Sequence, residues 1–277
     1  MKTLDARDVA GAYAICRRLA PRSLWGAMSL RRHLCAVHAF ARIVEDAADG
    51  KRALDARRRL EGLRRQLDVM DRRPARHPVL LALGRTMREL GLSREPFDEF
   101  LAAGLQDCAK TRYAGSGELL DYCRRSGAPV GRVVLQIHGY RDEERMRLCD
   151  RLGTGLRLAR ILRDLSIDLK RDRVYIPEED FRESGYSEGD LRMGVVNEPF
   201  RSLMKRQWKR TRVLLEEAEP LAGMLSWPLS WRVRSSWVKG NEVLHRIHKL
   251  GFDTLRRRPT LGRWFWPRLV TGVLSSR

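Results

Sequence analysis

The sequence predicts an all-α protein, and three observations support this fold class. Apolar residues recur at spacings of three and four along most of the chain, which is the period of one helix face. The alternating pattern of a strand is nearly absent, and the short stretch 174–177 comes nearest to it. Hydrophobic residues make up 43% of the 277 residues, which is enough for a sizeable core. We therefore expect one domain of antiparallel helices over residues 1–277.

The period of the apolar residues places the individual helices. In the segment 51–76 the face carrying Leu60, Leu63, Leu67 and Met70 is apolar, and arginines occupy the remaining positions. The same reasoning, applied in chain order, predicts helices over 9–20, 26–49, 53–71, 78–91, 96–109, 117–138, 143–169, 200–219 and 232–250.

Proline and glycine mark the breaks between these helices. Pro129 should kink or divide the helix over 117–138, because proline lacks a backbone N–H and clashes with the preceding turn. The stretch 184–199 contains three glycines and a proline, so we expect a surface loop or short helical turns there. None of the breaks resembles a long linker, which agrees with a single domain.

The chain is strongly basic, with 55 Lys and Arg against 35 Asp and Glu and a formal charge of +20. Such a charge suits nucleic acid, small polyanions or anionic membranes, or it belongs to solvated helix faces. The segment 51–76 favours solvated faces, because its arginines lie between core leucines. Zinc-finger spacing and RNA-binding aromatic signatures are absent, so we expect no nucleic-acid partner. A non-enzymatic binder of nucleic acid or membranes is the distant alternative.

The sequence also bears on location. No apolar run approaches the roughly 18–20 residues of a membrane-spanning helix, and the start of the chain lacks the apolar core of a signal peptide. Five scattered cysteines without a C-x-x-C pair fit a reducing cytoplasm.

Tryptophans crowd the last fifth of the chain. Trp227, Trp231 and Trp237 are expected to pack the last helices onto the domain. Residues 254–277 form a basic and aromatic tail that includes Trp264, Phe265 and Trp266, for which packing and peripheral membrane contact both stay open.

Two acidic pairs stand out on the predicted helices. Glu45 and Asp49 end one largely apolar stretch, and Asp164 and Asp168 follow another. Residues four apart share a helix face, and paired carboxylates repel each other unless a cation lies between them. Mg²⁺ prefers oxygen ligands and is commonly bound by one or two carboxylates together with substrate phosphates. Nearby arginines would bind the phosphates with forked hydrogen bonds.

At these motifs the chain resembles the squalene/phytoene synthase family of trans-isoprenyl diphosphate synthases. HAFARIVEDAADG (38–50) resembles the first aspartate-rich motif of the family, and RILRDLSIDLKRDRVYIP (160–177) resembles the second. The central segment 106–139, with DYCRRSGAPVGRVVL, and YAICRRLAP (13–21) are similar to the bacterial hydroxysqualene synthase branch. The resemblance covers most of the chain in family order.

The resemblance implies an isoprenoid-synthase-like helical bundle around a central cavity. It also implies a prenyltransferase that uses Mg²⁺ to ionise an allylic prenyl diphosphate, either farnesyl or dimethylallyl diphosphate. Squalene-type coupling, through presqualene or hydroxysqualene, would then join a second prenyl chain to the resulting cation. Metal ions and arginines would stabilise the departing diphosphate, and apolar walls would exclude water from the cation.

Carried over residue by residue, the resemblance and the acidic pairs give the expected site. The catalytic residues are Asp49, Asp164, Asp168 and Tyr122. The expected Mg²⁺ ligands are Glu45, Asp46, Asp49, Asp164 and Asp168. The expected diphosphate ligands are Arg42, Arg157, Arg160, Arg163, Arg173 and Tyr175. The expected cavity residues are Tyr13, Tyr113, Gly127, Pro129 and Val130.

The sequence departs from the family pattern at three positions. Glu45 stands where the family usually has Asp, and Arg157 and Arg160 stand where many members have Gln and Asn. Both arginines share a helix face with Asp164, so we expect them to point at the diphosphate and to reduce the number of bound Mg²⁺ ions. This favours, as an alternative, one allylic diphosphate and an aromatic small-molecule acceptor in secondary metabolism.

Overall fold

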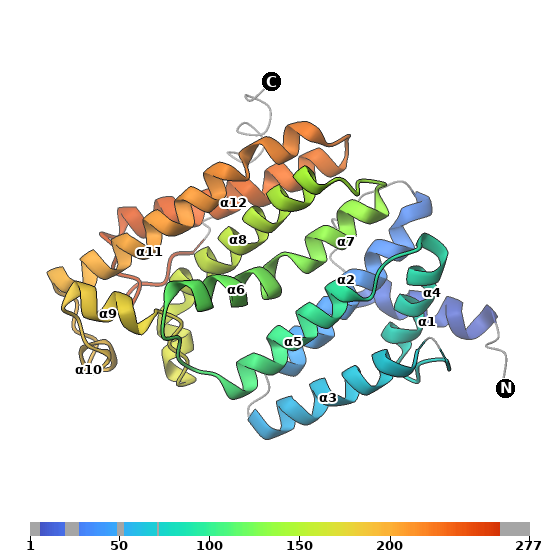
Figure 1. Cartoon of the computed structure of the whole chain (residues 1–277), viewed down its shortest axis with the longest axis horizontal. Helices are drawn as coiled ribbons and strands as arrows, with labels where there is room; N and C mark the ends of the chain where they lie inside the picture. Colours follow the sequence, from blue (N-terminus) through green and yellow to red (C-terminus); the bar gives the residue numbers. More distant parts are fainter. Residues whose placement is uncertain (1–5, 20–27, 49–52, 71, 261–277) are drawn as a thin grey trace. The chain divides into compact units, whose positions relative to one another are not determined.

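The computed structural model describes residues 6–19, 28–48, 53–70 and 72–260 (Figure 1). In these ranges the regular elements are helices and no strand is formed, which confirms the predicted fold class. Asp49 and the aromatic residues Trp264, Phe265 and Trp266 lie outside the described residues.

The helices group into two compact units, each made of two separate stretches of the chain. The first unit contains residues 1–109 and 129–146, and the second contains residues 110–128 and 147–277. The expected single domain over 1–277 stays a prediction beside this division.

The first unit is organised around α2 (Met28–Ala48), which contacts all five other helices of the unit. Its buried side chains include Leu34, Phe40 and Val44, and the ring of Phe40 meets that of Phe97 edge to face at 5.4 Å. The other helices are α1 (Ala6–Leu19), α3 (Ala53–Val69), α4 (Pro78–Leu90), α5 (Glu95–Ala109) and α7 (Pro129–Ile137).

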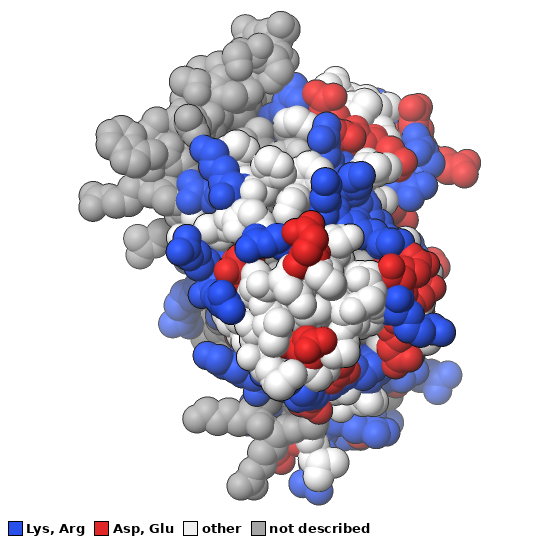
Figure 2. Space-filling view, turned by 90° about the vertical axis from the view of Figure 1, so that its left-hand side faces the viewer, with Lys and Arg blue, Asp and Glu red and all other residues white. Residues whose placement is uncertain are grey.

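The helix α3 bears out the amphipathic pattern read from its sequence. Leu60 and Leu67 are fully buried, whereas Arg57 forms an exposed ion pair with Glu61 at 2.8 Å. Figure 2 shows Lys and Arg side chains interspersed with Asp and Glu on one face of the molecule. The excess of basic residues thus includes arginines paired with acidic residues on solvated helix faces.

The second unit contains most of the long helix α8 (Glu143–Lys170) and α6 (Ser116–Gly127). Its remaining helices are α9 (Glu178–Ser184), α10 (Glu188–Arg192), α11 (Glu198–Glu217), the 3₁₀ helix η1 (Glu219–Met224) and α12 (Leu229–Lys249). The helices α11 and α12 run side by side (Figure 1). Pro129 divides the helix predicted over 117–138 into α6 and α7, as its chemistry requires.

Glycines let the helices of this unit approach closely. A Cβ built on Gly153 would lie 2.6 Å from Cα of Ala128, and one built on Gly127 would lie 2.3 Å from the carbonyl oxygen of Gly153. Side chains at these positions would collide with main-chain atoms that cannot turn away. The crossing of α6 and α8 therefore depends on both glycines. It fixes how the side chains of α6 are positioned along the axis of α8.

Buried polar groups join the later helices. Asp180 on α9 is 1% exposed and accepts hydrogen bonds from Gln207 at 2.6 Å and Arg210 at 2.9 Å, both on α11. The indole N–H of Trp237 donates to the carbonyl of Leu215 at 2.6 Å and ties α12 to α11. These bonds satisfy groups that would be costly to bury alone.

The expected packing of the tryptophans holds in part. Trp231 and Trp237 are half-buried, but the expectation was wrong for Trp227, whose exposed fraction is 80%. Trp227 lies in the short connection between η1 and α12, outside the helix faces that pack together. None of the described helices is long and apolar enough to span a membrane.

Candidate active site

The second acidic motif lies on the C-terminal half of α8. Asp164 is 8% exposed, and Arg163 binds it with two hydrogen bonds, from Nε to Oδ1 at 2.9 Å and from Nη2 to Oδ2 at 2.7 Å. Arg258, from the segment after α12, donates from Nε to the same Oδ1 at 2.9 Å. The guanidinium of Arg160 is more distant, with 3.8 Å between Nε and Oδ2.

These arginines set the ionisation of Asp164. Burial alone would raise the pKa of this carboxyl group, but the hydrogen bonds from Arg163 and Arg258 outweigh burial and hold the pKa below its usual value. Asp164 is therefore a carboxylate at neutral pH, with both oxygens bound to guanidinium groups.

Asp168, one turn further along α8, is in a different environment. Burial raises its pKa to about 6; the charge of Arg157 opposes the shift, and the neighbouring Asp164 adds to it. Within the described residues no side chain donates a hydrogen bond to its carboxylate. A desolvated carboxyl group of this kind costs free energy when it ionises, unless a cation binds it.

Three tyrosines form a cluster beside this motif. Tyr113, Tyr122 and Tyr175 are buried, with ring centroids 5.5–5.8 Å apart. Tyr175 lies roughly parallel to both of the others, in the range of favourable ring stacking. They come from the segment before α6, from α6 itself and from the segment after α8.

Arg157 of α8 lies against the tyrosine cluster. Its guanidinium carbon is 5.2 Å from the ring centroid of Tyr122 and 5.8 Å from that of Tyr175, and an Nη atom donates to the hydroxyl of Tyr122. Cation–π contact and the hydrogen bond fix the orientation of this positive charge. The predicted Arg157, Tyr122 and Tyr175 are thus brought together.

The segment after α8 turns back toward Asp168. The main-chain N–H groups of Arg171 and Arg173 both donate to the carbonyl of Asp168 at 2.9 Å, and Asp172 between them has a φ of 57°. The positive charge of Arg173 also lowers the pKa of Asp168. The turn therefore places Arg173 near the second acidic motif, and its role as a diphosphate ligand stays a prediction.

The first acidic motif belongs to the first unit. Glu45 and Asp46 are exposed near the end of α2, and Asp46 accepts a hydrogen bond from Arg42 at 3.0 Å. Asp49 lies outside the described residues. Tyr13 is half-buried in the same unit, and its hydroxyl forms a hydrogen bond with Oγ1 of Thr86 at 3.0 Å. Nδ1 of His33 forms a second hydrogen bond with the same Oγ1 at 3.1 Å.

The remaining predicted cavity residues lie at the junction of α6 and α7. Gly127 ends α6 at the close crossing with α8, Pro129 begins α7 and is buried, and Val130 is half-buried. The crossing gives Gly127 a packing role in this structure, and its role at a substrate cavity stays a prediction.

The carboxylates of the second motif differ in how well they suit Mg²⁺. Asp168 fits, because it is a desolvated oxygen ligand that a cation would stabilise. Asp164 does not fit in the arrangement seen, because both its oxygens accept hydrogen bonds from arginines. Metal binding through Asp164 would require these arginines to move. Among the described residues no group of three or more His, Cys, Asp and Glu side chains is placed to hold a metal.

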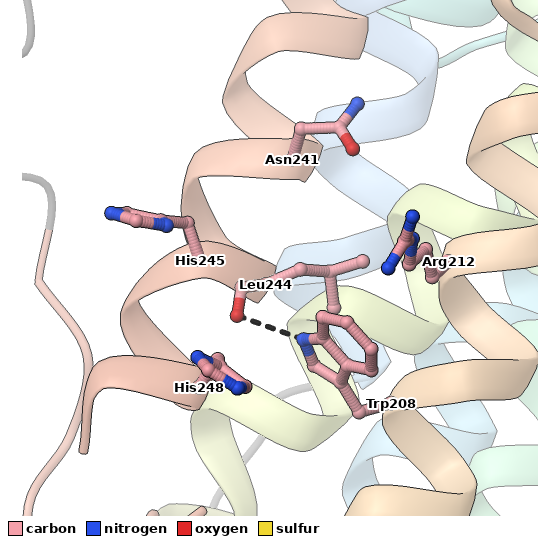
Figure 3. A pocket seen from close by; sticks show the side chains of 6 residues that line it. All are labelled: Trp208, Arg212, Asn241, Leu244, His245 and His248. Carbon is pink, nitrogen blue, oxygen red and sulfur yellow. Dashed lines mark hydrogen bonds between the residues drawn. The ribbon is translucent and has the colours of Figure 1, made fainter. Parts of the chain in front are cut away.

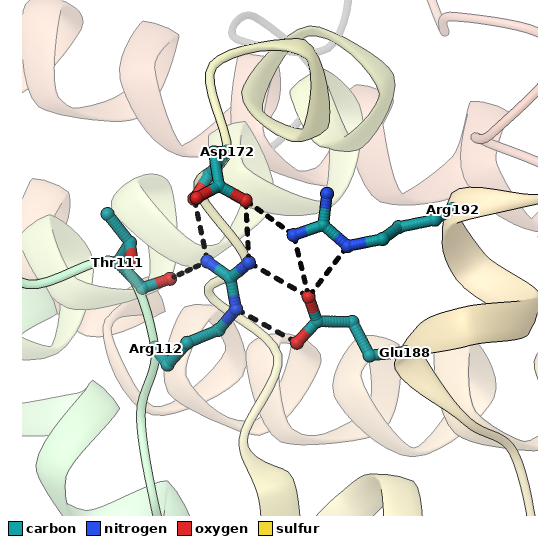
Figure 4. Close-up of polar contacts among 5 residues, drawn as sticks. All are labelled: Thr111, Arg112, Asp172, Glu188 and Arg192. Carbon is teal, nitrogen blue, oxygen red and sulfur yellow. Dashed lines mark hydrogen bonds and ion pairs between the residues drawn. The ribbon is translucent and has the colours of Figure 1, made fainter.

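Two arginines at this site were missed by sequence reasoning. Arg258 contacts Asp164 across 94 positions of the chain, and Arg112 joins Asp172 across 60 positions (Figure 4). Helical periodicity carries no information about such distant pairs. The R-Y pair of Arg112 and Tyr113 was a usable signal, because Tyr113 itself was a predicted site residue.

A separate hollow of about 360 Å³ lies between α11 and α12 (Figure 3). Trp208 forms part of its wall and donates its indole N–H to the carbonyl of Leu244 at 2.8 Å. None of the predicted site residues lines it. Its lining residues are Trp208, Arg212, Asn241, Leu244, His245 and His248.

Comparison with known proteins supports the resemblance seen in the sequence. The profile of the squalene/phytoene synthase family matches residues 7–265. Phytoene synthase 1 of Zea mays is 29% identical over 90% of this chain, and 15-cis-phytoene synthase of Synechococcus elongatus is 26% identical over 91%. The chain spans 63% of the length of the maize protein and 89% of the length of the Synechococcus protein.

Solved structures agree with this result. The squalene synthase HpnC from Alicyclobacillus acidocaldarius is 30% identical, with a TM-score of 0.80 over 90% of this chain and 97% of its own. A dehydrosqualene synthase, at 20% identity, shares the fold with a TM-score of 0.83 over 97% of this chain and 96% of its own. The matching profile and these likenesses show that the chain belongs to the squalene/phytoene synthase family, a family of prenyltransferases with an isoprenoid-synthase fold.

Proposed function

We propose that this chain is a Mg²⁺-dependent prenyltransferase that ionises an allylic prenyl diphosphate and joins its prenyl group to a second prenyl chain. The observation that carries the proposal is the cluster formed by α8 and the segment after it. There a desolvated carboxyl group, Asp168, lies beside a carboxylate, Asp164, and several guanidinium groups. This combination of oxygen ligands and arginines suits a metal-bound diphosphate.

In the proposed reaction the carbon–oxygen bond of the allylic diphosphate breaks, and its electron pair leaves with the diphosphate. Bound Mg²⁺ would neutralise the charge that develops on the departing diphosphate. Asp168 would hold the metal, together with Asp164 once its arginines have moved. Glu45, Asp46 and Asp49 stay the Mg²⁺ ligands predicted from the first motif.

The arginines have a separate role in the proposal. Arg163 and Arg173 would bind phosphate oxygens, since guanidinium groups match phosphate with forked hydrogen bonds. Arg157 is held on two tyrosine rings and by the Tyr122 hydroxyl, so its charge stays in place throughout the reaction. A fixed positive charge suits a diphosphate and repels a metal ion. This supports the expectation that α8 holds fewer Mg²⁺ ions than it does in a typical family member.

The names of the relatives favour coupling of two prenyl chains, because they are phytoene and squalene synthases. The double bond of the second chain would capture the allylic cation, forming a carbon–carbon bond and releasing a proton. Transfer of the prenyl group to an aromatic acceptor, which Arg157 and Arg160 suggest, is the competing proposal. Analysis of the product distinguishes the two.

We also infer that the enzyme works in the cytoplasm and meets membranes at its surface. All five cysteines are thiols in the structure, which suits a reducing compartment. Arg256 and Arg257 are exposed at the start of the basic tail and would favour anionic lipid headgroups.

The proposal is tested by incubating the protein with Mg²⁺ and labelled farnesyl, geranylgeranyl or dimethylallyl diphosphate. We expect release of pyrophosphate and a coupled hydrocarbon or alcohol from one of the longer donors. Asp168→Asn should lower the rate by about 10²–10³-fold, whereas Asp121→Asn, on the exposed face of α6, serves as the matched control. If a prenylated product forms only when an aromatic acceptor is added, the function is prenyl transfer to an aromatic acceptor and the proposed coupling is wrong.

A further inference from the structure

We infer that Arg112 is a positioning residue that fixes the diphosphate-binding segment 171–177, an inference that rests on the proposed function. Arg112 lies in the connection between α5 and α6 and belongs to a network with Asp172, Glu188 and Arg192, here called the latch (Figure 4). The latch joins three stretches of the second unit that lie far apart in sequence.

Every N–H group of the Arg112 side chain donates a hydrogen bond, four of them within the latch and one to Thr111. Nε donates to Oε2 of Glu188 and Nη2 to its Oε1, both at 2.8 Å. Nη2 also donates to Oδ1 of Asp172 at 2.8 Å, and Nη1 donates to the Asp172 carbonyl at 2.6 Å and the Thr111 carbonyl at 2.8 Å. A guanidinium has five N–H donors in a fixed plane, which a lysine cannot reproduce.

The latch holds the backbone of the segment as well as its side chains. Asp172 has a φ of 57°, in the left-handed region that few residues other than glycine adopt readily. Arg112 binds both the carbonyl and the carboxylate of this residue and so selects that conformation. Arg192 adds a hydrogen bond to the Asp172 carboxylate and one to Glu188 at 3.0 Å.

Main-chain hydrogen bonds continue the junction beyond the latch. The N–H of Val174 donates to the carbonyl of Thr111 at 2.9 Å, and the N–H of Glu178 donates to the carbonyl of Tyr113 at 2.9 Å. Tyr113, which directly follows Arg112, therefore stacks on Tyr175, with 5.8 Å between the ring centroids. The latch thus sets the register in which the two segments meet.

Two predicted substrate residues depend on this register. Arg173 directly follows Asp172, and Tyr175 supplies one of the rings under Arg157. A slip of the segment would move a phosphate-binding charge and disturb the tyrosine cluster together. Displacements of about 1 Å in a binding group are enough to cost up to 10²-fold in rate. Arg112 thereby acts on the substrate through Arg173 and Tyr175 without touching it.

The first arm of the test measures the segment itself by amide hydrogen exchange of the metal-free protein. Arg112→Lys keeps the charge but loses the planar fork, and we expect exchange at Arg173, Val174 and Tyr175 to become about tenfold faster. Amides of α12 should be unchanged. Arg212→Lys, which alters an exposed ion pair with Glu216 on α11, is the matched control. Unchanged exchange in the 173–175 amides of Arg112→Lys would overturn the inference.

The second arm measures the affinity for inorganic pyrophosphate and for farnesyl diphosphate, each with Mg²⁺, by calorimetry. We expect Arg112→Lys to weaken pyrophosphate binding about tenfold and Arg173→Gln to weaken it by a similar factor. The double variant should be within about twofold of Arg173→Gln alone, because residues acting through one group are not additive. Losses that multiply would show that Arg112 acts independently of Arg173.

The outcomes separate this inference from the proposed function. A wild-type protein that binds neither ligand contradicts the proposed function and, with it, any role of the latch toward a diphosphate. If the folded Arg112→Lys variant binds both ligands as tightly as the wild type does, the positioning role of Arg112 is contradicted and the proposed function is not. If Arg112→Lys does not fold, Asp172→Asn takes its place, because asparagine tolerates the left-handed conformation and removes one charged partner. We expect at least a threefold loss of pyrophosphate affinity from Asp172→Asn, and an unchanged affinity would contradict the inference.

Discussion

Asp164 and Asp168 lie one turn apart on α8, yet their removal should have opposite effects on the stability of the metal-free protein. Asp168 is desolvated, and its carboxylate is costly to ionise in the native state. Asp168→Asn should therefore stabilise the fold at neutral pH. Asp164→Asn should destabilise it, because Arg163 and Arg258 would lose the charge that they bind.

The magnitude for Asp168 follows from its pKa, which burial raises from 3.8 to about 6. One pKa unit corresponds to about 1.4 kcal/mol, so the shift amounts to about 3 kcal/mol as an upper estimate. The native state binds this proton more tightly than the unfolded state. Stability of the wild type therefore falls as pH rises from about 4 to about 6, and it levels off above that range.

The corresponding figure for Asp164 comes from its hydrogen bonds to charged groups, which contribute about 2 kcal/mol to stability. Both arginines are partly exposed, which limits the loss. The pH dependence also differs. The lowered pKa of Asp164 means that its contribution is present at neutral pH and lost in acid.

Urea unfolding with a metal chelator, measured between pH 4 and pH 8, tests both values. The stability difference between Asp168→Asn and the wild type should be near zero at the acid end and grow to between 1 and about 3 kcal/mol above pH 6. Asp121→Asn should lower stability at neutral pH by at most about 0.5 kcal/mol, because it loses an exposed ion pair with Arg125. If Asp168→Asn is less stable than the wild type at pH 7.5, the carboxylate is not desolvated in the way described here.

Further predictions concern packing, the tyrosine cluster and pH. Gly153→Ala should lower the free energy of unfolding by about 2–4 kcal/mol in urea titrations, because the new Cβ meets main-chain atoms at 2.6 Å; Gly223→Ala, with nothing within 4 Å, should change it by less than about 0.5 kcal/mol. Tyr122→Phe removes the hydroxyl that accepts a hydrogen bond from Arg157, so turnover should fall about tenfold at saturating donor; an unchanged rate would remove Tyr122 from the site. Burial lowers the pKa of His33, so the unfolded state binds its proton more readily and stability should fall as pH drops below about 6.5. His33→Asn should flatten this part of a pH titration of stability, and an unchanged slope would contradict the assignment.

Most of the helices could be predicted from the sequence because their apolar faces repeat with the helical period. The segment predicted over 78–91 forms a helix at Pro78–Leu90, and that over 143–169 forms one at Glu143–Lys170. The division of the segment 117–138 at Pro129 could also be predicted, because the effect of a proline on a helix is local. Trp227 was misjudged because aromatic content alone does not tell a packed face from a short connection.

The site was predictable as a set of chemical groups but not as an arrangement. Spacing placed Asp164 and Asp168 on one face of α8, and the chain order of the motifs carried the family resemblance. The partner of Asp164 at Arg258 and the partner of Asp172 at Arg112 depend on how distant segments pack. The pKa values of Asp164 and Asp168 shift in opposite directions because of those partners and of burial. The spacing of the two residues in the sequence predicts neither.

The measurement that tests the central claim most directly is product analysis with labelled farnesyl and geranylgeranyl diphosphate, with Mg²⁺ and after its removal by a chelator. We predict stoichiometric pyrophosphate release and a product containing two prenyl chains, formed with Mg²⁺ and lost with the chelator or in Asp168→Asn. Binding of neither donor in the presence of Mg²⁺, by calorimetry on the folded wild-type protein, would contradict the account.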